Sequence, residues 1–421
     1  MNRYLPLICL ALIHTVVDTS ALLVSPIWNE ITIECRLAGA SLVVVMLSQA
    51  MPTSLAQGVF GYLRDRRRMG ALIIGAPLLA VVCLTAIGPA VNPGRVPLLC
   101  GLFIVGGVAV GAFHPEAAVT VGSLLPENRT RALSIFMLGG SLGLAIGPTL
   151  SGLVVKAWGL DGLARLMPGL VCLVPLLYWG MRSRLKGRRL PPTTRAALSV
   201  KEMFDGRLGL ALFLLLVCSL RLVPNMGLAK IVAFTLANRG FGPLEIGYVQ
   251  SAFLVSGSLG MLLMAMLFRQ GWERSFLIAC PLIGLPFLAV LGWQECPTWL
   301  FLTMLFPTGL VLWGTTPTMV SYAQQMFPRG AGLASAMTMG LAWGGGGLIE
   351  VGFTAHFRDI NAPQCAVWAF IPFVAISALG AWFLPDAVAD SSTLQPVNPP
   401  STCEEDHFGG TATPENEEEK T

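Results

Sequence analysis

Long apolar stretches alternate with short polar turns along most of this chain. Residues 37–63 carry no charged side chain, and neither do residues 69–91. Each stretch exceeds the roughly 20 apolar residues that cross a bilayer as an α-helix. Continued along the chain, the pattern predicts twelve membrane-spanning helices, at about residues 4–27, 38–62, 70–91, 97–122, 132–155, 166–181, 208–232, 246–268, 275–293, 298–320, 332–353 and 364–384.

One longer polar connection divides the predicted spans into six and six. The fifth and eleventh spans are both rich in glycine and both follow a basic loop, which indicates two related halves. We therefore predict an all-α polytopic membrane protein with two pseudo-symmetric six-helix halves, residues 1–181 and 208–385, joined by a cytoplasmic linker, 182–207. Residues 386–421 are acidic and rich in Pro and Thr, which predicts a disordered cytoplasmic tail.

The composition agrees with a membrane protein. Of 421 residues, 54% are hydrophobic and 12% are charged, whereas soluble domains average about 25% charged. Short loops rich in Lys and Arg stay in the cytoplasm. If the arginine-rich turn 64–68 is placed inside, most of the 27 Lys and Arg fall on the cytoplasmic side. This predicts a multi-pass protein of the cell membrane with both termini cytoplasmic.

Several functional classes are excluded by missing motifs. The sequence has no Gly-x-x-x-x-Gly-Lys-Ser/Thr phosphate loop, so ATP is not the expected energy source. The ten cysteines include no Cys-x-x-Cys pair, which argues against a metal site or a disulfide framework. No nucleophile–base pair is visible, so we expect no enzyme. We expect no cofactor, metal or nucleic-acid partner, and a monomer in the lipid bilayer.

Ionisable residues inside the predicted spans are the candidate functional groups, because each costs several kcal/mol there unless it is paired or faces a wet cavity. His14 and Asp18 are four residues apart, so they share a helix face in the first span. In the fourth span, His114 and Glu116 flank Pro115. Imidazoles titrate near neutral pH, and these four residues are therefore candidates for proton coupling.

A structural interpretation stands beside the proton path. Asp18 or Glu116 would then be the permanent partner of Arg221 or Lys230 in the seventh span, holding the halves together. For Asp18 both interpretations remain open. For Glu116 the structural one is favoured, as an ion pair with Arg66 at the cytoplasmic mouth.

Two further roles are predicted inside the spans. Besides its possible pairing with a carboxylate, Arg221 is a candidate residue of a substrate cavity. Glu350 lies near the outer end of the eleventh span, where we expect it only to cap the helix.

Two motifs resemble those of the major facilitator superfamily. The stretch 61–68, Gly-Tyr-Leu-Arg-Asp-Arg-Arg-Arg, resembles the loop motif that follows the second helix in that family. The fifth span resembles its antiporter motif, with Gly143, Gly147, Pro148, Ser151 and Gly152.

Other elements make the chain similar to fosmidomycin-resistance-type efflux proteins over about residues 4–385. They are His14-x3-Asp18, the Phe-His-Pro-Glu-Ala element at 113–117, the segment 220–241 and the glycine-rich run 332–347. The Pro-containing element in the fourth helix is the most specific of them.

The resemblance implies a secondary active transporter that exports a small organic compound in exchange for protons, by alternating access between two halves. It implies that Gly61, Asp65 and Arg66 form a gate that holds the outward-facing state. One departure is Phe268, which stands where the second half should repeat the aspartate.

Two other functions remain open. The same fold can act as a proton-coupled uptake symporter, although the Gly-Pro motif of the fifth helix favours export. A non-transporting sensor or scaffold, with the acidic tail as a docking segment, is less favoured, because a scaffold has no reason to bear the cost of charges inside the membrane.

Overall fold

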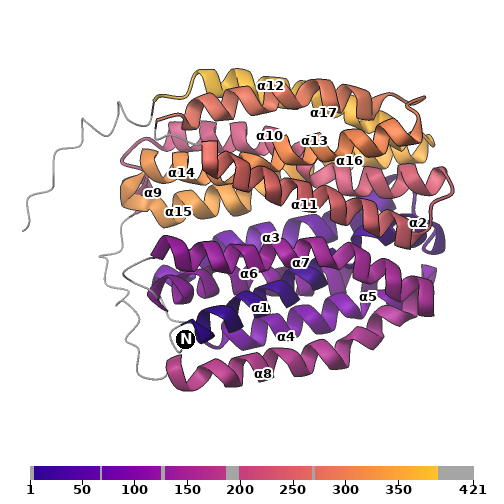
Figure 1. The fold of residues 1–421 in the computed structure, drawn as a ribbon, viewed down its shortest axis with the longest axis horizontal. Helices are drawn as coiled ribbons and strands as arrows, with labels where there is room; N and C mark the ends of the chain where they lie inside the picture. Colours follow the sequence, from indigo (N-terminus) through magenta and orange to yellow (C-terminus); the bar gives the residue numbers. More distant parts are fainter. Residues whose placement is uncertain (1–3, 67–68, 125–128, 186–198, 268–270, 387–421) are drawn as a thin grey trace, which may run out of the picture.

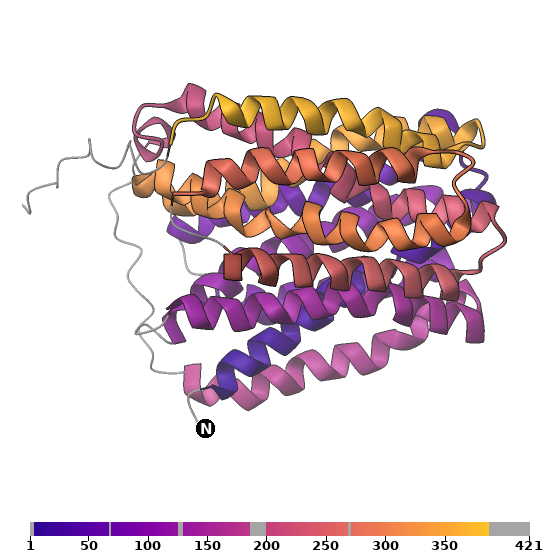
Figure 2. The ribbon, with the colours of Figure 1, turned by 45° about the horizontal axis from the view of Figure 1, so that its top comes forward.

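The computed structural model describes residues 4–66, 69–124, 129–185, 199–267 and 271–386. Every regular element in these residues is helical. The helices lie side by side, with those of the N-terminal half grouped apart from those of the C-terminal half (Figure 1). The view in Figure 2, turned by 45°, keeps the same grouping. The linker segment 186–198 and the tail 387–421 lie outside the described residues, so their predicted roles remain predictions.

Among the described residues, the first half contains eight α-helices and three short 3-10 helices, which together make up six spans. They are α1 (Leu5–Leu22), η1 (Ser25–Ile27), α2 (Trp28–Glu34), α3 (Gly39–Arg66), α4 (Leu72–Thr85), α5 (Ile87–Ala90), η2 (Pro93–Arg95), α6 (Val96–Leu124), α7 (Arg129–Trp158), η4 (Leu160–Leu166) and α8 (Met167–Leu185).

The second half begins with one short helix and continues with the remaining spans. Its elements are α9 (Val200–Met203), α10 (Leu208–Asn238), α11 (Pro243–Leu267), α12 (Glu273–Gly292), α13 (Thr298–Gly314), α14 (Thr316–Met326), η5 (Pro328–Gly330), α15 (Ala331–Ala336), η6 (Met337–Leu341), α16 (Ala342–Asp359), η7 (Pro363–Cys365) and α17 (Ala366–Trp382).

Ten helical segments among the described residues are long and apolar enough to cross a membrane. The other two predicted spans correspond to α4 with α5, which is shorter, and to α15, η6 and α16, which are rich in glycine. The predicted fold class is therefore confirmed. Several spans extend beyond their predicted ends. The first continues through η1 and α2 to Glu34, and α3 remains helical to Arg66. The seventh, tenth and eleventh spans each end six residues later than predicted, at Asn238, Met326 and Asp359.

The same packing pairs occur in both halves. Helix α1 packs against α7, and its counterpart α10 packs against α16. Helices α3 and α6 pair as α11 and α13 do, and α4 pairs with α8 as α12 does with α17. Between the halves, α7 packs against α11, and α3 packs against α16. A six-helix packing motif is therefore used twice and joined along two seams.

Glycines of α7 allow close approach on both of its sides. A Cβ at Gly143 would lie 2.5 Å from the carbonyl oxygen of Thr15 and 2.9 Å from the Cβ of Asp18 on α1. A Cβ at Gly152 would lie 2.6 Å from the Cα of Leu244 on α11. The glycines of the helix-five motif therefore bring α7 against its own half and against the other half.

We predict that Gly143→Ala lowers the free energy of unfolding by about 1–3 kcal/mol, because the added methyl group meets backbone atoms that cannot turn aside. Gly101→Ala on α6 is the control, since nothing lies within 4 Å of its added Cβ. Thermal unfolding of the purified proteins measures both. An equal unfolding temperature for Gly143→Ala and the wild type would contradict the close contact.

Candidate functional site

Helix α1 contributes two side chains, His14 and Asp18, to the candidate site. His14 follows Leu5 by nine residues, about 14 Å along the helix, which is near the middle of a hydrocarbon core of ~30 Å. His14 is 2% exposed and Asp18 is 8% exposed. Their four-residue spacing places the His14 Nε2 3.2 Å from an Asp18 carboxylate oxygen. The predicted common face is therefore a direct contact.

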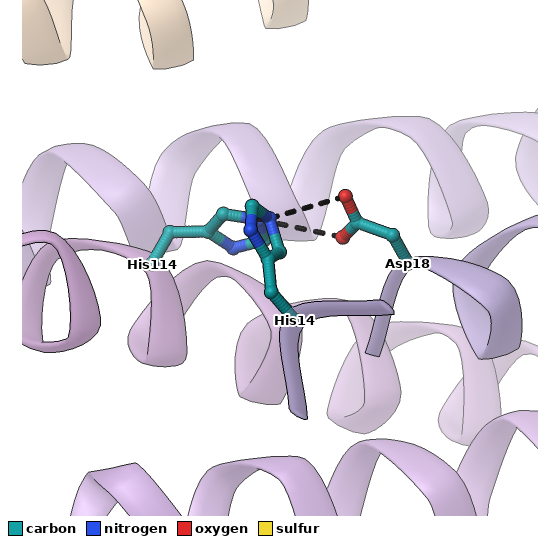
Figure 3. A group of neighbouring side chains, drawn as sticks. All are labelled: His14, Asp18 and His114. Carbon is teal, nitrogen blue, oxygen red and sulfur yellow. Dashed lines mark hydrogen bonds and ion pairs between the residues drawn. The ribbon is translucent and has the colours of Figure 1, made fainter. Parts of the chain in front are cut away.

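The third member comes from α6. The Nε2 of His114 lies 3.1 Å from the Nε2 of His14 and 3.4 Å from the other carboxylate oxygen of Asp18. Figure 3 shows both imidazoles converging on this carboxylate. We call His14, Asp18 and His114 the His-Asp-His cluster. The sequence pattern groups His14 with Asp18 and His114 with Glu116. Spacing along the chain does not predict how α1 and α6 align, so the contact of His114 with the first pair is not predictable from it.

Backbone carbonyls determine which nitrogens of the two imidazoles carry hydrogen. The Nδ1 of His14 lies 2.9 Å from the carbonyl oxygen of Phe136, and the Nδ1 of His114 lies 2.7 Å from that of Val110. A carbonyl oxygen only accepts, so each Nδ1 is assigned the hydrogen and donates it. In a neutral imidazole the Nε2 is then a bare acceptor.

Three hydrogen-bond acceptors therefore face one another inside the cluster. An ionised Asp18 also only accepts, so the contacts between the three residues contain no donor unless a proton is added. One extra proton on either Nε2 or on the carboxylate supplies that donor. The arrangement thus requires a bound cation, for which a proton is sufficient.

The same atoms form a donor set for a metal ion. One ligand atom from each of the three residues lies within 4.8 Å of the others, and imidazole with carboxylate is a combination that Zn²⁺ accepts. The sequence predicts no metal. A proton and a metal ion would satisfy the same three atoms, and treatment with a chelator separates the two.

Helix α7 closes the cluster on a third side. The ring of Phe136 stacks on His14 with centroids 4.1 Å apart. A Cβ at Gly140 would lie 2.6 Å from the His14 Nε2 and 2.9 Å from an Asp18 oxygen. The close approach that glycine allows thus leaves the cluster without room for another side chain, and α7 contributes a carbonyl, a ring and a glycine to it.

Glu116 is not part of this cluster. Its carboxylate lies 2.6 Å from the Nε of Arg64, and both side chains are buried. The atoms do not meet the geometry of a hydrogen bond, so the contact is an ion pair. The structural interpretation of Glu116 is supported, with Arg64 as its observed partner. The side chain of the predicted partner, Arg66, lies outside the described residues.

Helix register explains the change of partner. The α3 face that meets α6 includes Gln57, close to Gly111. Arg64 follows Gln57 by seven residues, about two turns, and so falls on the same face. Because α3 stays helical to its end, Arg66 lies about 200° further round the helix.

Glu350 requires a correction of the prediction, because it does more than cap its helix. It is fully buried, forms an ion pair with Lys230 on α10, and accepts a hydrogen bond of 2.7 Å from Thr354. The Nζ of Lys230 also lies 5.9 Å from the ring centroid of Trp28. Lys230 thus has its own partner, and Asp18 instead contacts the two histidines.

Arg221 lies inside the C-terminal half, where α10 faces α13 and α14. It donates to the carbonyl oxygen of Leu312 and to the Sδ of Met319, and it is 2% exposed. Its predicted role in a substrate cavity stays a prediction at this point.

The gate residues are described only in part. Gly61 faces the other half, since a Cβ there would lie 3.7 Å from that of Ala336 on α15. Asp65 and Arg66 belong to the last turn of α3, and their side chains lie outside the described residues, as does Phe268.

The helix-five motif has a packing role wherever it is described. Besides Gly143 and Gly152, a Cβ at Gly147 would lie 2.8 Å from the carbonyl oxygen of Thr19. The carbonyl of Pro148 approaches Gly247 on α11 too closely for any side chain there.

The helices of the described residues form twelve spans in two equivalent sets, with ionisable groups buried between them, and this arrangement defines a polytopic protein of the transporter class. The family model described as Major Facilitator Superfamily matches residues 7–350 of the chain. The chain belongs to the major facilitator superfamily.

Two relatives are similar over most of their length. The uncharacterized MFS-type transporter YfnC of Bacillus subtilis is 25% identical over 385 residues, which cover 88% of this chain and 91% of YfnC. The fosmidomycin resistance protein of Escherichia coli is 25% identical over 387 residues, which cover 90% and 92%. The resemblance to proteins of this type is confirmed.

Solved structures share the fold at low sequence identity. A D-xylose-proton symporter matches with a TM-score of 0.69 and 14% identity, covering 91% of this chain and 98% of its own. The nucleoside transporter NupG matches with a TM-score of 0.66 and 14% identity, covering 94% and 100%. These proteins carry different substrates, so the shared fold does not name one.

We predict that Glu116→Gln lowers the free energy of unfolding by about 3–5 kcal/mol, because it leaves the buried Arg64 without its counter-charge. Replacing both residues by apolar ones, as in Arg64→Met with Glu116→Leu, should restore most of this stability. Arg274→Gln, which breaks an ion pair with the exposed Asp386, is the control and should cost no more than about 1 kcal/mol. Thermal unfolding of the four proteins provides the comparison, and a harmless Glu116→Gln would refute the structural role.

Proposed function

We propose that this protein is a secondary active transporter that exports a small organic compound in exchange for protons, by alternating access. The observation that carries the proposal is the His-Asp-His cluster, in which three acceptors converge and require a cation. A buried site that binds one proton reversibly is what coupling to a proton gradient needs. Transporters of this architecture also bind substrates and coupling ions near the middle of the membrane, which is the level expected for His14.

Helix α7 offers a route from proton binding to conformational change. The carbonyl oxygen of Phe136 on α7 accepts the hydrogen bond from His14. Further along, the hydroxyl of Thr149 lies 2.8 Å from that of Ser251 on α11 of the other half. A shift of α7 that follows a change of charge in the cluster would therefore alter the seam between the halves. Two faces packed by glycine can slide past one another with little change of side-chain packing.

Export is favoured over uptake on two grounds. The glycine–proline motif of α7 resembles the antiporter motif of the superfamily, and a relative of similar length is a fosmidomycin resistance protein. Proton-driven uptake is the second candidate, because a D-xylose-proton symporter has the same fold. We further propose that the chain acts as a monomer in the cell membrane with both termini in the cytoplasm.

Proton coupling is tested in liposomes with an imposed pH gradient and a panel of small organic compounds. We expect a compound to move against its gradient as protons move the other way. Asp18→Asn, His14→Gln and His114→Gln should each reduce this gradient-driven flux at least about tenfold, since each removes one of the three converging groups. His356→Gln, at an exposed histidine of α16, should leave it unchanged.

Two outcomes would count against the assignment. Undiminished, proton-driven flux in all three cluster variants would place coupling elsewhere. Loss of flux after treatment of the wild type with a strong chelator, and its recovery with Zn²⁺, would show that the cluster holds a metal ion instead of a proton.

The direction of transport is read from the same assay. Co-transport of the compound with protons would replace export by uptake.

The gate is tested by Asp65→Asn. Position 65 is four residues after Gly61, so both positions lie on the α3 face directed at α15. We expect flux to fall several-fold while the protein remains in the membrane with an unchanged unfolding temperature. Deleting 387–421 is the parallel control, and it should leave flux intact. Unchanged flux in Asp65→Asn would refute the gate. Loss of a bound partner on deletion of the tail, in a protein that moves no compound, would support the scaffold alternative.

A further inference from the structure

Three basic side chains are buried among the described residues, and one of them differs from the others. Arg64, Arg221 and Lys230 are each no more than 4% exposed. Arg64 pairs with Glu116 and Lys230 with Glu350. Arg221 makes no ion pair with any described carboxylate. A buried cation without a counter-charge costs several kcal/mol. The positive charge of Arg221 therefore lacks the negative partner that Arg64 and Lys230 have.

We propose that Arg221 and Asn225 bind the anionic group of the substrate, which makes the cargo of the proposed transporter a small organic anion. This inference rests on the proposed transport function. It names the chemical class of the substrate, and a binding experiment tests it without any gradient.

The donors around Arg221 are only partly used. A guanidinium carries five N–H donors, of which one is directed at the carbonyl of Leu312 and one at the sulfur of Met319, a weak acceptor. The Nε of Arg221 is buried without a partner. A planar fork of N–H groups matches an oxyanion better than it matches single carbonyl oxygens.

Other unpartnered polar groups lie along the same helix faces. Asn225 follows Arg221 by four residues and so shares its face of α10. It is 3% exposed, and both its side-chain oxygen and its nitrogen lack a partner. Thr316 lies in the sequence between Leu312 and Met319, the two residues that Arg221 contacts, and its buried hydroxyl lacks a partner too. Unsatisfied buried groups cost about 1–3 kcal/mol each, and an oxyanion would satisfy the donors together.

Aromatic side chains nearby would suit the organic part of such an anion. Trp313 directly follows Leu312, and its ring packs edge to face on Trp343 of α16 with centroids 5.3 Å apart. The indole N–H of Trp313 is buried without a partner. Helices α10, α13 and α16 thus combine a cation, neutral donors and aromatic rings.

A purely structural role for Arg221 is the competing explanation. The Leu312 carbonyl belongs to the last turn of α13, which ends at Gly314, and a cation there is favoured by the helix dipole. That role uses one N–H group of the guanidinium. It leaves Asn225 and Thr316 unexplained, and it predicts a different effect of replacing Arg221 by an apolar side chain.

Calorimetric titration of the purified protein at constant pH tests the proposal. The probes are benzoate, phenylphosphonate and the neutral benzamide, so that the two anions separate a carboxylate from a phosphonate site. We expect wild type to bind one anion and not benzamide, and Arg221→Met to bind it at least tenfold more weakly. Arg165→Met, the same change at an exposed arginine that contacts Trp158, is the control and should bind as wild type does.

The unfolding temperature separates binding from structure. If Arg221 serves binding, Arg221→Met without ligand should unfold at the wild-type temperature or above it, because an unpaired buried charge has been removed. The proposal is overturned if wild type binds neither anion, if Arg221→Met binds as tightly as wild type, or if Arg221→Met unfolds at a lower temperature. Proton-coupled flux is measured separately, so a negative binding result leaves the proposed coupling standing.

Discussion

The cost of a charge in an apolar interior is the constraint on which this structure depends. Most of the buried ionisable groups described here contact a partner on another helix, and these contacts tie specific helices together. The pair of Arg64 with Glu116 joins α3 to α6, and that of Lys230 with Glu350 joins α10 to α16. The His-Asp-His cluster joins α1, α6 and α7. The two halves share the same helix-packing pairs, but they do not share the same pairs of buried charges. The fold is therefore common to both halves, whereas the candidate functional groups differ between them.

Sequence patterns predicted the architecture well because the bilayer imposes a length and a polarity on every span. The pattern could not resolve breaks such as the one near Ser25, where a short 3-10 turn continues the first span. The candidate site was predicted only as residue types. The spacing of His14 and Asp18 alone places them on one helix face. His114 reaches them only because α1 and α6 pack with these residues at the same level, and the sequence pattern does not specify that packing. The pattern did not identify Arg64 as the partner of Glu116, because it predicts that the second span ends at residue 62, whereas α3 continues to Arg66.

Close packing at glycine and charge pairing have opposite mechanical consequences. An ion pair buried in one half resists separation, so α3 with α6 and α10 with α16 are expected to move as units. The seam of α7 with α11 is held by hydroxyl contacts such as Thr149 with Ser251, and by glycines that bring backbones together. Such a seam loses little when it shifts. The structure therefore combines stiff halves with a seam suited to the relative motion that alternating access requires.

The two proposed sites lie in different halves, and one side chain connects the helices that carry them. The amide of Gln250 on α11 donates to the carbonyl of Ser25, which continues α1, and to the carbonyl of Ala229 on α10. Helix α1 carries His14 and Asp18 of the His-Asp-His cluster, and α10 carries Arg221. A movement of α1 on protonation would strain this bridge and so reach α10 without any direct contact between cluster and anion. Coupling by this route needs two discrete arrangements of the bridge, with the anion favouring one and the proton the other.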